Sequence, residues 1–296
     1  MFSLAECVSW LAVTLMLSLA IIILNLITII VFMKNGNLRK RSTYLLINLA
    51  VIDMLAGVIA MESFASFIGA YSCNLWKEFL PDKLHVYVAI LEVLFPVASV
   101  TNITAISLER LHATFWPLRH RVMQKWIYGL IVAMTWATVG LVAIGVGVLL
   151  QSKEPSHYFY LWNSFNSVCL LIISVSYVSI VIKVRCGAQP QHHGAASRER
   201  KLSMTLFIVT FVSMLIWLPY VIFAFLSSAT DIFSSLSITA FRQLNISLVA
   251  LYYANSLVNP ILYTARMPDF RRALVAVFCR RTQLLNQFQD FPLRDM

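Results

Sequence analysis

Acidic side chains stand inside stretches of this chain that are otherwise apolar, and they suggest the first chemistry to consider. Asp53 lies in the run NLAVIDML (48–55), Glu62 follows about two helical turns later, and Glu92 lies in the next apolar stretch. An ionised carboxylate in an apolar environment costs free energy unless a cation or hydrogen-bond donors balance its charge. These residues therefore indicate the binding of a cation.

Other polar patterns interrupt the apolar stretches further along the chain. Glu109 and Arg110 are adjacent, so the arginine has a carboxylate within reach, and Trp217 precedes Pro219 by two residues. A proline removes a backbone hydrogen bond and kinks a helix. The run NSLVNPILY (255–263) places two amides and a hydroxyl ahead of Pro260. Taken singly, each pattern also fits an ordinary core residue.

The elements that position these residues come from a very apolar chain. It has 296 residues, of which 59% are hydrophobic and 12% are charged, and its mean hydropathy is +0.78. Ordinary globular proteins carry about 25% charged residues. This composition excludes a soluble enzyme and predicts a polytopic membrane protein.

Seven stretches are long enough to cross a membrane, since a spanning helix needs about 20 predominantly apolar residues. The run LAVTLMLSLAIIILNLITIIVFM (11–33) is apolar on every face, whereas strands of a membrane barrel alternate in polarity. We therefore predict an all-α membrane protein, a seven-transmembrane helix bundle. The predicted spans are 8–33, 43–71, 82–113, 126–150, 157–185, 199–227 and 239–264.

The net charge of +10 is distributed unevenly between the two sides of the predicted bundle. Among the 23 basic residues, only four fall in the segments assigned to the outside, namely Lys77, Lys83, Lys153 and Arg242. Positive charge favours the cytoplasmic side, so we expect an extracellular N-terminus and a cytoplasmic C-terminus in the plasma membrane. The basic clusters then face anionic membrane lipids rather than nucleic acid.

Three of the five cysteines carry expectations of their own. Cys7 and Cys73 both lie near the outer face, where an oxidising compartment allows a disulfide, but the sequence leaves their pairing open. Cys279 lies about 15 residues after the last span, where a thiol suits palmitoylation. An ordinary apolar contact is the alternative for Cys279.

Several polar and aromatic residues occur in a fixed order along the seven spans. They are Asn25, Asn48-Leu49-Ala50-x-x-Asp53, Glu109-Arg110-Leu111, Trp136, Tyr177, Trp217-x-Pro219 and Asn259-Pro260-x-x-Tyr263. In order and spacing they resemble the motifs of rhodopsin-like (class A) G-protein-coupled receptors over nearly the whole chain. The resemblance implies a short amphipathic eighth helix from Met267, a receptor domain over 1–279 and a cytoplasmic tail over 280–296.

Three departures from that family's pattern narrow the resemblance. His85 stands where most members have a cysteine bridged to the second outer loop, and Cys169 stands where most have a proline. With a very short second outer loop, these features are similar to melanocortin receptors. The inner loop at 113–119 looks like that of the adenosine group.

The resemblance assigns a resting contact to Arg110. Glu199 lies 20 residues before Pro219, or about 30 Å along a helix, which places it at the level of Arg110. The pair would tie the third and sixth spans together, beside the contact with Glu109. Tyr177 and Tyr263 would turn inward on activation. Glu199 in a solvated charge cluster is the alternative.

The resemblance also assigns a sodium site to the polar residues in mid-membrane. Its ligands would be Asp53, Ser99, Asn255 and Asn259, whose oxygen atoms suit a hard cation. A hydrogen-bonded water network without an ion is the alternative. Sodium would act as an allosteric ligand, and no other cofactor is expected.

Glu92 occupies the place where amine receptors carry an aspartate that pairs with the ligand ammonium. Tyr253, Tyr220 and Trp217 would surround such a cation with aromatic faces. Alternatively, Glu62 and Glu92 would bind a short basic peptide or a divalent ion. A structural ion pair of Glu92 with the nearby Lys83 or His85 remains a further alternative.

These expectations describe a receptor rather than an enzyme. An extracellular ligand would bind between the helices and favour a state that activates a cytoplasmic heterotrimeric G protein. The alternative is an ion or solute transporter or channel that uses the intramembrane carboxylates, although no repeated halves are visible. The ligand and the G-protein subtype stay open.

Overall fold

The computed structural model of the chain describes residues 2–38, 43–76, 82–150, 156–186, 211–213, 215–227, 230 and 232–289. Within these residues the chain forms helices joined by short turns, and no strand occurs. The predicted all-α bundle is confirmed. Its long helices are α1 (Leu4–Lys34), α2 (Thr43–Phe64) continued by the π-helix η2 (Ala65–Ser72), α3 (Asp82–Phe115), α5 (Lys125–Leu150), α6 (Ser156–Cys186) and α8 (Ile238–Arg266).

Six of the described helices are long and apolar enough to cross a membrane. A shorter apolar helix, Phe211–Ser227, lies in the predicted sixth span, and the first part of that span is outside the described residues. The helix ends agree with the predicted spans to within a few residues. Large apolar side chains such as Leu141, Ile144 and Val148 on α5 are exposed, as expected of a surface that faces lipid.

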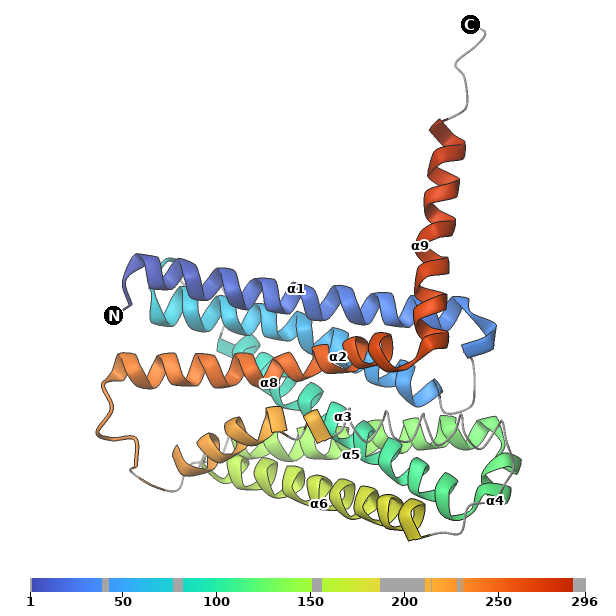
Figure 1. Ribbon diagram of the computed structural model, residues 1–296. Helices are drawn as coiled ribbons and strands as arrows, with labels where there is room; N and C mark the ends of the chain where they lie inside the picture. Colours follow the sequence, from blue (N-terminus) through green and yellow to red (C-terminus); the bar gives the residue numbers. More distant parts are fainter. Residues whose placement is uncertain are drawn as a thin grey trace, which may run out of the picture.

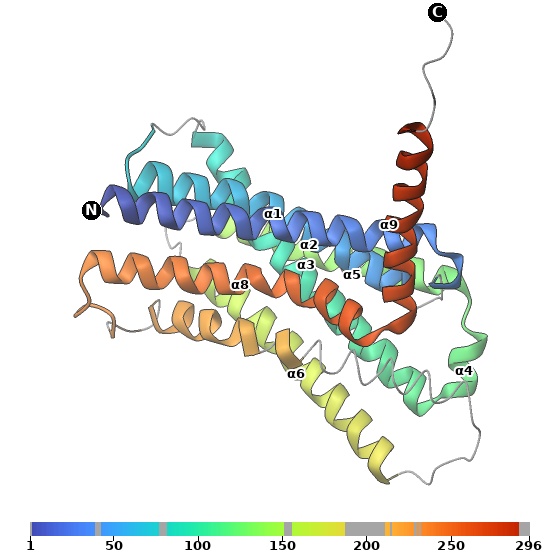
Figure 2. The same ribbon diagram turned by 45° about the horizontal axis from the view of Figure 1, so that its top comes forward.

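The two ends of the bundle carry different structures (Figures 1 and 2). The N-terminus lies at one end, together with the turn that leads into α8. At the other end lie the short helix α4 (Pro117–Val122) and α9 (Pro268–Gln289), which runs across the direction of the bundle (Figure 1). The 3-10 turn η1 (Gly36–Leu38) follows α1.

Helix α9 is the expected amphipathic eighth helix, but it is longer than we expected. Phe270 is buried against Phe32 and Tyr263, while Arg271 and Arg272 are exposed. The helix continues to Gln289, so the expected boundary at residue 279 falls inside it. Half of the segment expected as a tail is therefore helical.

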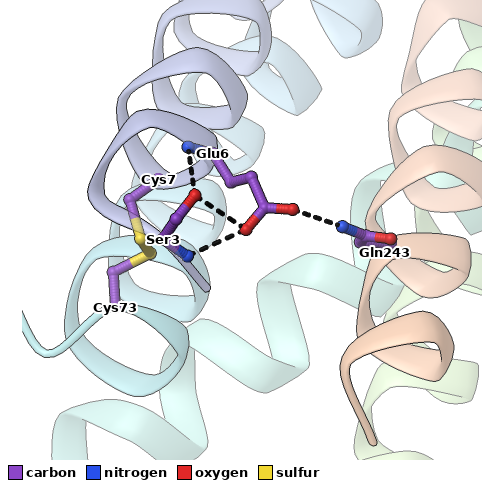
Figure 3. Close-up of a disulfide and its surroundings, with 5 residues drawn as sticks. All are labelled: Ser3, Glu6, Cys7, Cys73 and Gln243. Carbon is purple, nitrogen blue, oxygen red and sulfur yellow. Dashed lines mark hydrogen bonds between the residues drawn. A yellow bond between two sulfur atoms is a disulfide. The ribbon is translucent and has the colours of Figure 1, made fainter. Parts of the chain in front are cut away.

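The start of α1 is fixed by local contacts and by a disulfide (Figure 3). The Ser3 hydroxyl accepts a hydrogen bond from the Glu6 backbone, and the Glu6 carboxylate accepts one from the Ser3 backbone at 2.8 Å, which is a capping box. Cys7 forms a disulfide with Cys73, directly after η2. The bridge that the sequence left open therefore ties α1 to the end of η2.

Candidate ligand, ion and switch sites in the bundle

The centre of the bundle holds a fully buried carboxylate. Ser99 on α3 and Ser256 on α8 each donate a hydrogen bond to Asp53 Oδ1 at 3.1 Å. Asn259 Nδ2 donates one to Asp53 Oδ2 at 2.7 Å. Three donors from two other helices therefore converge on Asp53, which lets the polar group be buried.

Three buried asparagine oxygens of the first and seventh predicted spans have no hydrogen-bond partner in the described part of the chain. Among the described residues, the side-chain oxygens of Asn25, Asn255 and Asn259 accept no hydrogen bond. The amide of Asn25 donates to the backbone of Ser256 at 3.0 Å, which links α1 to α8. Such oxygen atoms suit a cation or ordered water.

The structure brings together three of the four predicted sodium ligands. Ser99 and Asn259 bond to Asp53 directly, whereas no hydrogen bond joins Asn255 to it. Ser256, named in the sequence but not proposed as a ligand, bonds to Asp53 instead. The described residues contain no group of three or more His, Cys, Asp or Glu side chains that could hold a metal ion.

A second polar network joins three helices beside this cluster. Asn48 donates to the Asn102 side chain at 2.8 Å, and Trp136 Nε1 donates to Asn48 at 3.1 Å. Asn102 in turn donates to the backbone of Leu45 at 3.0 Å. The motif residues Asn48 and Trp136 thus meet, and Asn102 is a partner that the sequence did not assign.

The expected contact of Glu109 with Arg110 is present, and both side chains are buried. Glu109 accepts two further contacts through its other oxygen, one from His120 on α4 at 2.7 Å and one from the Tyr128 hydroxyl on α5 at 3.1 Å. One carboxylate therefore connects α3 with α4 and α5. Sequence reasoning did not find His120 or Tyr128, because nothing in their spacing relates them to Glu109.

The remaining switch residues are tested only in part. Glu199 lies outside the described residues, so its contact with Arg110 stays a prediction. Tyr177 and Tyr263 are buried, and the Tyr263 ring contacts those of Phe32 and Phe270. Their movement on activation also stays a prediction. Cys279 lies on α9, but its side chain is outside the described part, so its lipidation is untested.

The two outer carboxylates lie close enough for their charges to repel each other. Ser63 donates a hydrogen bond to Glu92, and Ser66 donates one to Glu62 Oε1 at 2.8 Å. Glu62 Oε2 is buried and has no hydrogen-bond partner in the described part of the chain. Tyr253 is near enough to feel both charges. The structure thus places Glu62, Glu92 and Tyr253 near one another. Their role in ligand binding stays a prediction.

Aromatic rings from three helices form one cluster near these carboxylates, and we call it the aromatic cluster. Tyr252 stacks on Trp217 with ring centroids 6.0 Å apart, and Tyr220 lies 4.9 Å from Tyr252. Trp162 on α6 approaches Tyr220 and Tyr252 at 6.0 and 6.3 Å. Tyr253 contacts Tyr252 edge-on at 5.9 Å. Trp162 and Tyr252 extend the set predicted from the sequence.

A cavity of about 470 Å³ opens beside this cluster, near the turn into α8. Its size falls in the range of small-molecule sites, about 300–1,000 Å³. Tyr220 belongs to both the cavity and the aromatic cluster. The other lining residues include Phe67, Phe223, Phe233, Phe241, Arg242 and Asn245.

A bundle of apolar spanning helices, with a buried central carboxylate and a paired Glu109 and Arg110, defines a helical membrane receptor. Residues 24–263 match the 7 transmembrane receptor (rhodopsin family), and the chain belongs to that family. It is therefore a G-protein-coupled receptor and a multi-pass membrane protein, not an enzyme. The transporter or channel alternative has no support in this match.

The chain is similar to several named receptors over most of the length of both proteins. The histamine H2 receptor from Homo sapiens is 27% identical, over 91% of this chain and 80% of its own. Trace amine-associated receptor 5 from Rattus norvegicus is 27% identical, over 86% and 81%. Melanocortin receptor 5 from Homo sapiens is 26% identical, over 96% and 88%. Amine receptors and a melanocortin receptor both occur among these relatives.

Proposed function

We propose that this receptor is activated by an extracellular cationic amine, whose ammonium group lies beside Glu92 and Glu62. The observation that carries the proposal is the pair of neighbouring carboxylates, neither of which forms an ion pair with a described basic side chain. The side chains of Lys83 and His85, the alternative partners of Glu92, lie outside the described part of the chain. Two such charges within a largely apolar bundle require a cation. A ligand that enters from outside can supply it.

The aromatic cluster supports an amine as the cation. Ammonium groups are attracted to the faces of Trp and Tyr rings within about 6 Å of the ring centroid. Tyr253 feels the charges of both carboxylates and contacts Tyr252 in the cluster, so aromatic faces adjoin the acidic pair. Histamine and trace amine receptors among the relatives agree with this class of ligand.

A short basic peptide is the second candidate ligand, and the pairing of the two carboxylates favours it. Glu62 and Glu92 together can balance two positive charges, which one peptide with two basic residues supplies. A melanocortin receptor stands among the relatives. A divalent ion would have only these two carboxylates among the described acidic, histidine and cysteine side chains.

We place the N-terminus outside the plasma membrane and the C-terminus in the cytoplasm. The N-terminus and α9 lie at opposite ends of the bundle (Figure 1). The disulfide of Cys7 lies at the N-terminal end, and disulfides persist in oxidising surroundings. The exposed Arg271 and Arg272 on α9 would then meet anionic lipids of the inner leaflet.

Ligand binding would activate a heterotrimeric G protein through the cytoplasmic end of the bundle. The ligand can do so only through a higher affinity for the active state. Glu109, His120 and Tyr128 join α3, α4 and α5 there, so a change in their contacts would move α4 relative to α3. A sodium ion at Asp53 would favour the resting state as an allosteric ligand.

Glu92→Gln tests the proposal because it keeps the shape of the side chain and removes its charge. If Glu92 pairs with the ligand ammonium, the free energy of the agonist interaction should become less favourable by about 2–5 kcal/mol, and agonist potency should fall accordingly. Surface expression should be retained. Potency in a second-messenger assay and surface level are measured on the same cells. Ser63→Ala, which removes only the hydrogen bond to Glu92, is the matched control with a smaller effect.

Two other patterns would contradict the amine proposal. Lower surface expression with unchanged potency would mean that a residue of the receptor itself balances Glu92. A chelator that weakens the parent and does nothing further to Glu92→Gln would mean that a divalent ion bridges Glu62 and Glu92.

A further inference from the structure

The cavity of about 470 Å³ carries a charge opposite to that of the proposed ammonium site. Arg242 is the one charged residue among its described lining residues, and neither Glu62 nor Glu92 lines it. A guanidinium is always protonated in proteins, so the cavity has a permanent positive charge. That charge repels an ammonium group. The cavity is therefore separate from the site proposed for the amine.

No acidic side chain in the described part of the chain forms an ion pair with Arg242. The ion pairs found there both involve Glu109. Glu6 lies near the first turns of α8, but its carboxylate accepts hydrogen bonds from Ser3 and from Gln243. Arg242 is half-buried, and water and salt screen a partly buried charge less than an exposed one. Its charge therefore attracts an anion to the cavity.

A second hydrogen-bond donor lies beside Arg242. Asn245 lines the same cavity, three residues further along α8. Side chains three residues apart on a helix are neighbours on one face. The guanidinium has five N–H donors and the amide has two, whereas both oxygens of a carboxylate only accept. A carboxylate therefore matches this pair of residues, and its bonds to a guanidinium are of the strong, charge-assisted kind.

Three phenylalanine rings form an apolar part of the cavity lining. Phe223 is buried, and its ring centroid lies 5.1 Å from that of Phe233 and 5.5 Å from that of Phe241. The centroids of Phe233 and Phe241 are 6.3 Å apart. Aromatic rings favour stacked or edge-on contacts with other rings at such separations. The lining thus suits a flat ring as well as a carboxylate.

We infer that this cavity is a second ligand site, which binds a small aromatic carboxylate separately from the amine. The carboxylate accepts hydrogen bonds from Arg242 and Asn245, and the ring packs against the three phenylalanines. The cavity lies beside the turn into α8, at the end of the bundle that carries the N-terminus (Figure 1). In the proposed orientation, the anion therefore enters from the extracellular side.

The inference is tested with two probes that differ in charge. Naphthoate is a flat aromatic carboxylate that is ionised at neutral pH, and the corresponding naphthamide has nearly the same shape without the charge. Binding to the purified receptor in phosphatidylcholine nanodiscs is measured from the rise in melting temperature with probe concentration. Naphthoate should bind about tenfold more tightly, as expected for a hydrogen bond to a charged group. Equal affinities, or no binding of naphthoate, overturn the inference.

Arg242→Gln should remove the advantage of naphthoate over naphthamide, whereas Arg242→Lys keeps the positive charge and should retain part of it. Arg266→Gln is the matched control, because it removes an exposed charge from the other end of α8 and should change neither affinity. Phe241→Leu removes a ring but no charge, so it should weaken both probes alike. An advantage that survives in Arg242→Gln overturns the inference.

Two other partners of Arg242 are outcomes of the same measurements. Asp231 lies outside the described residues. If it neutralised Arg242 within the receptor, naphthoate would have no advantage in the parent and would gain one only in Asp231→Asn, which overturns the inference. Displacement of naphthoate by a water-soluble, short-chain phosphatidylglycerol would assign the cavity to a lipid headgroup and would also overturn it. Binding that this lipid leaves unchanged supports a free carboxylate.

The outcomes separate this inference from the proposed function. Glu92→Gln should leave the affinity for naphthoate unchanged, because Glu92 does not line the cavity. If Glu92→Gln changes naphthoate binding as strongly as Arg242→Gln does, the carboxylate does not lie in this cavity and the inference fails. A response to amines that is unaffected by Glu92→Gln contradicts only the proposed function, since naphthoate carries no ammonium.

Discussion

The Asp53 carboxylate already accepts hydrogen bonds, and these bonds restrict how an ion could bind beside it. Ser99, Ser256 and Asn259 already donate to the two carboxylate oxygens. A sodium ion would draw on the oxygens that remain unsatisfied, on Asn255 and Asn259, as well as on Asp53. Binding therefore requires the ion to share Asp53 with these donors rather than to displace them all.

Asp53→Asn should make agonist affinity less sensitive to sodium concentration. The amide keeps the size of the side chain but removes the charge that attracts the ion. Agonist affinity is measured in membranes over a range of sodium chloride, with potassium chloride at equal ionic strength as the control. A parent receptor without any sodium dependence would contradict the ion site and leave a water network in its place.

Site residues that belong to family motifs were predictable from the sequence. Site residues outside those motifs were not. Asp53, Ser99 and Asn259 meet as the family resemblance implied. His120 reaches Glu109 only because α4 folds back against α3, which no local pattern encodes. Partners that depend on tertiary packing therefore had to come from the structure.

At the scale of elements, α1 and α2 approach closely at Gly57. A Cβ added at Gly57 would lie 2.8 Å from Ile21 Cγ2 and 3.2 Å from Ile21 Cβ, which is too close for either atom to stay in place. Ile21 is fully buried and β-branched, so it has few rotamers into which it can move. The absence of a side chain at Gly57 therefore sets the separation of the two helices.

Gly57→Ala should destabilise the receptor by about 1–3 kcal/mol, the usual cost of overpacking a core. Gly140→Ala on α5 is the matched control, because a Cβ there meets nothing within 4 Å. It should be neutral or stabilising by up to about 1 kcal/mol, since alanine favours helix over glycine. Thermal unfolding of both purified variants gives the comparison, and equal effects would refute the close approach.

The disulfide between Cys7 and Cys73 joins the first turns of α1 to the end of η2. Most members of this family have a bridged cysteine at the position that His85 occupies here. This chain lacks that cysteine. A hydrogen bond of 3.1 Å from Gln243 to Glu6 also links α1 to α8 beside the bridge (Figure 3). α1, η2 and α8 are thus connected at the end of the bundle that carries the N-terminus.

Cys7→Ser and Cys73→Ser should each lower thermal stability by about 2–4 kcal/mol, the typical contribution of a disulfide. The double variant should be no worse than either single one, because both remove the same bond. Melting temperature and surface level are measured for all three. Additive losses would mean that the two cysteines act separately and that no bridge forms in cells.

At the scale of the whole molecule, the fold was predictable because lipid imposes a strong constraint. Every spanning segment must satisfy its own backbone hydrogen bonds, because lipid offers no partners. Long apolar runs therefore predict helices. The length of α9 was not predictable in the same way, because an amphipathic surface helix has no fixed thickness to match.

At the end of the bundle that carries α4, the Arg110 guanidinium has donors for a second contact. The contact with Glu109 is made through Nε, and a guanidinium has five N–H donors in total. The remaining donors sit on the two Nη atoms, which can bind another carboxylate in a bidentate manner. We expect Glu199, which the sequence puts at the level of Arg110 along the predicted sixth span, to provide it.

Glu199→Gln should therefore raise signalling in the absence of ligand. The variant keeps the side chain's shape but loses the charge that would hold the sixth span against α3, and a lost buried pairing costs up to about 3–5 kcal/mol. Basal second-messenger level is compared at matched surface expression. Arg200→Gln changes a charge on the same segment and should leave basal signalling unchanged. Equal basal levels in the parent and Glu199→Gln would show that Glu109 alone restrains Arg110 and that Glu199 is solvated.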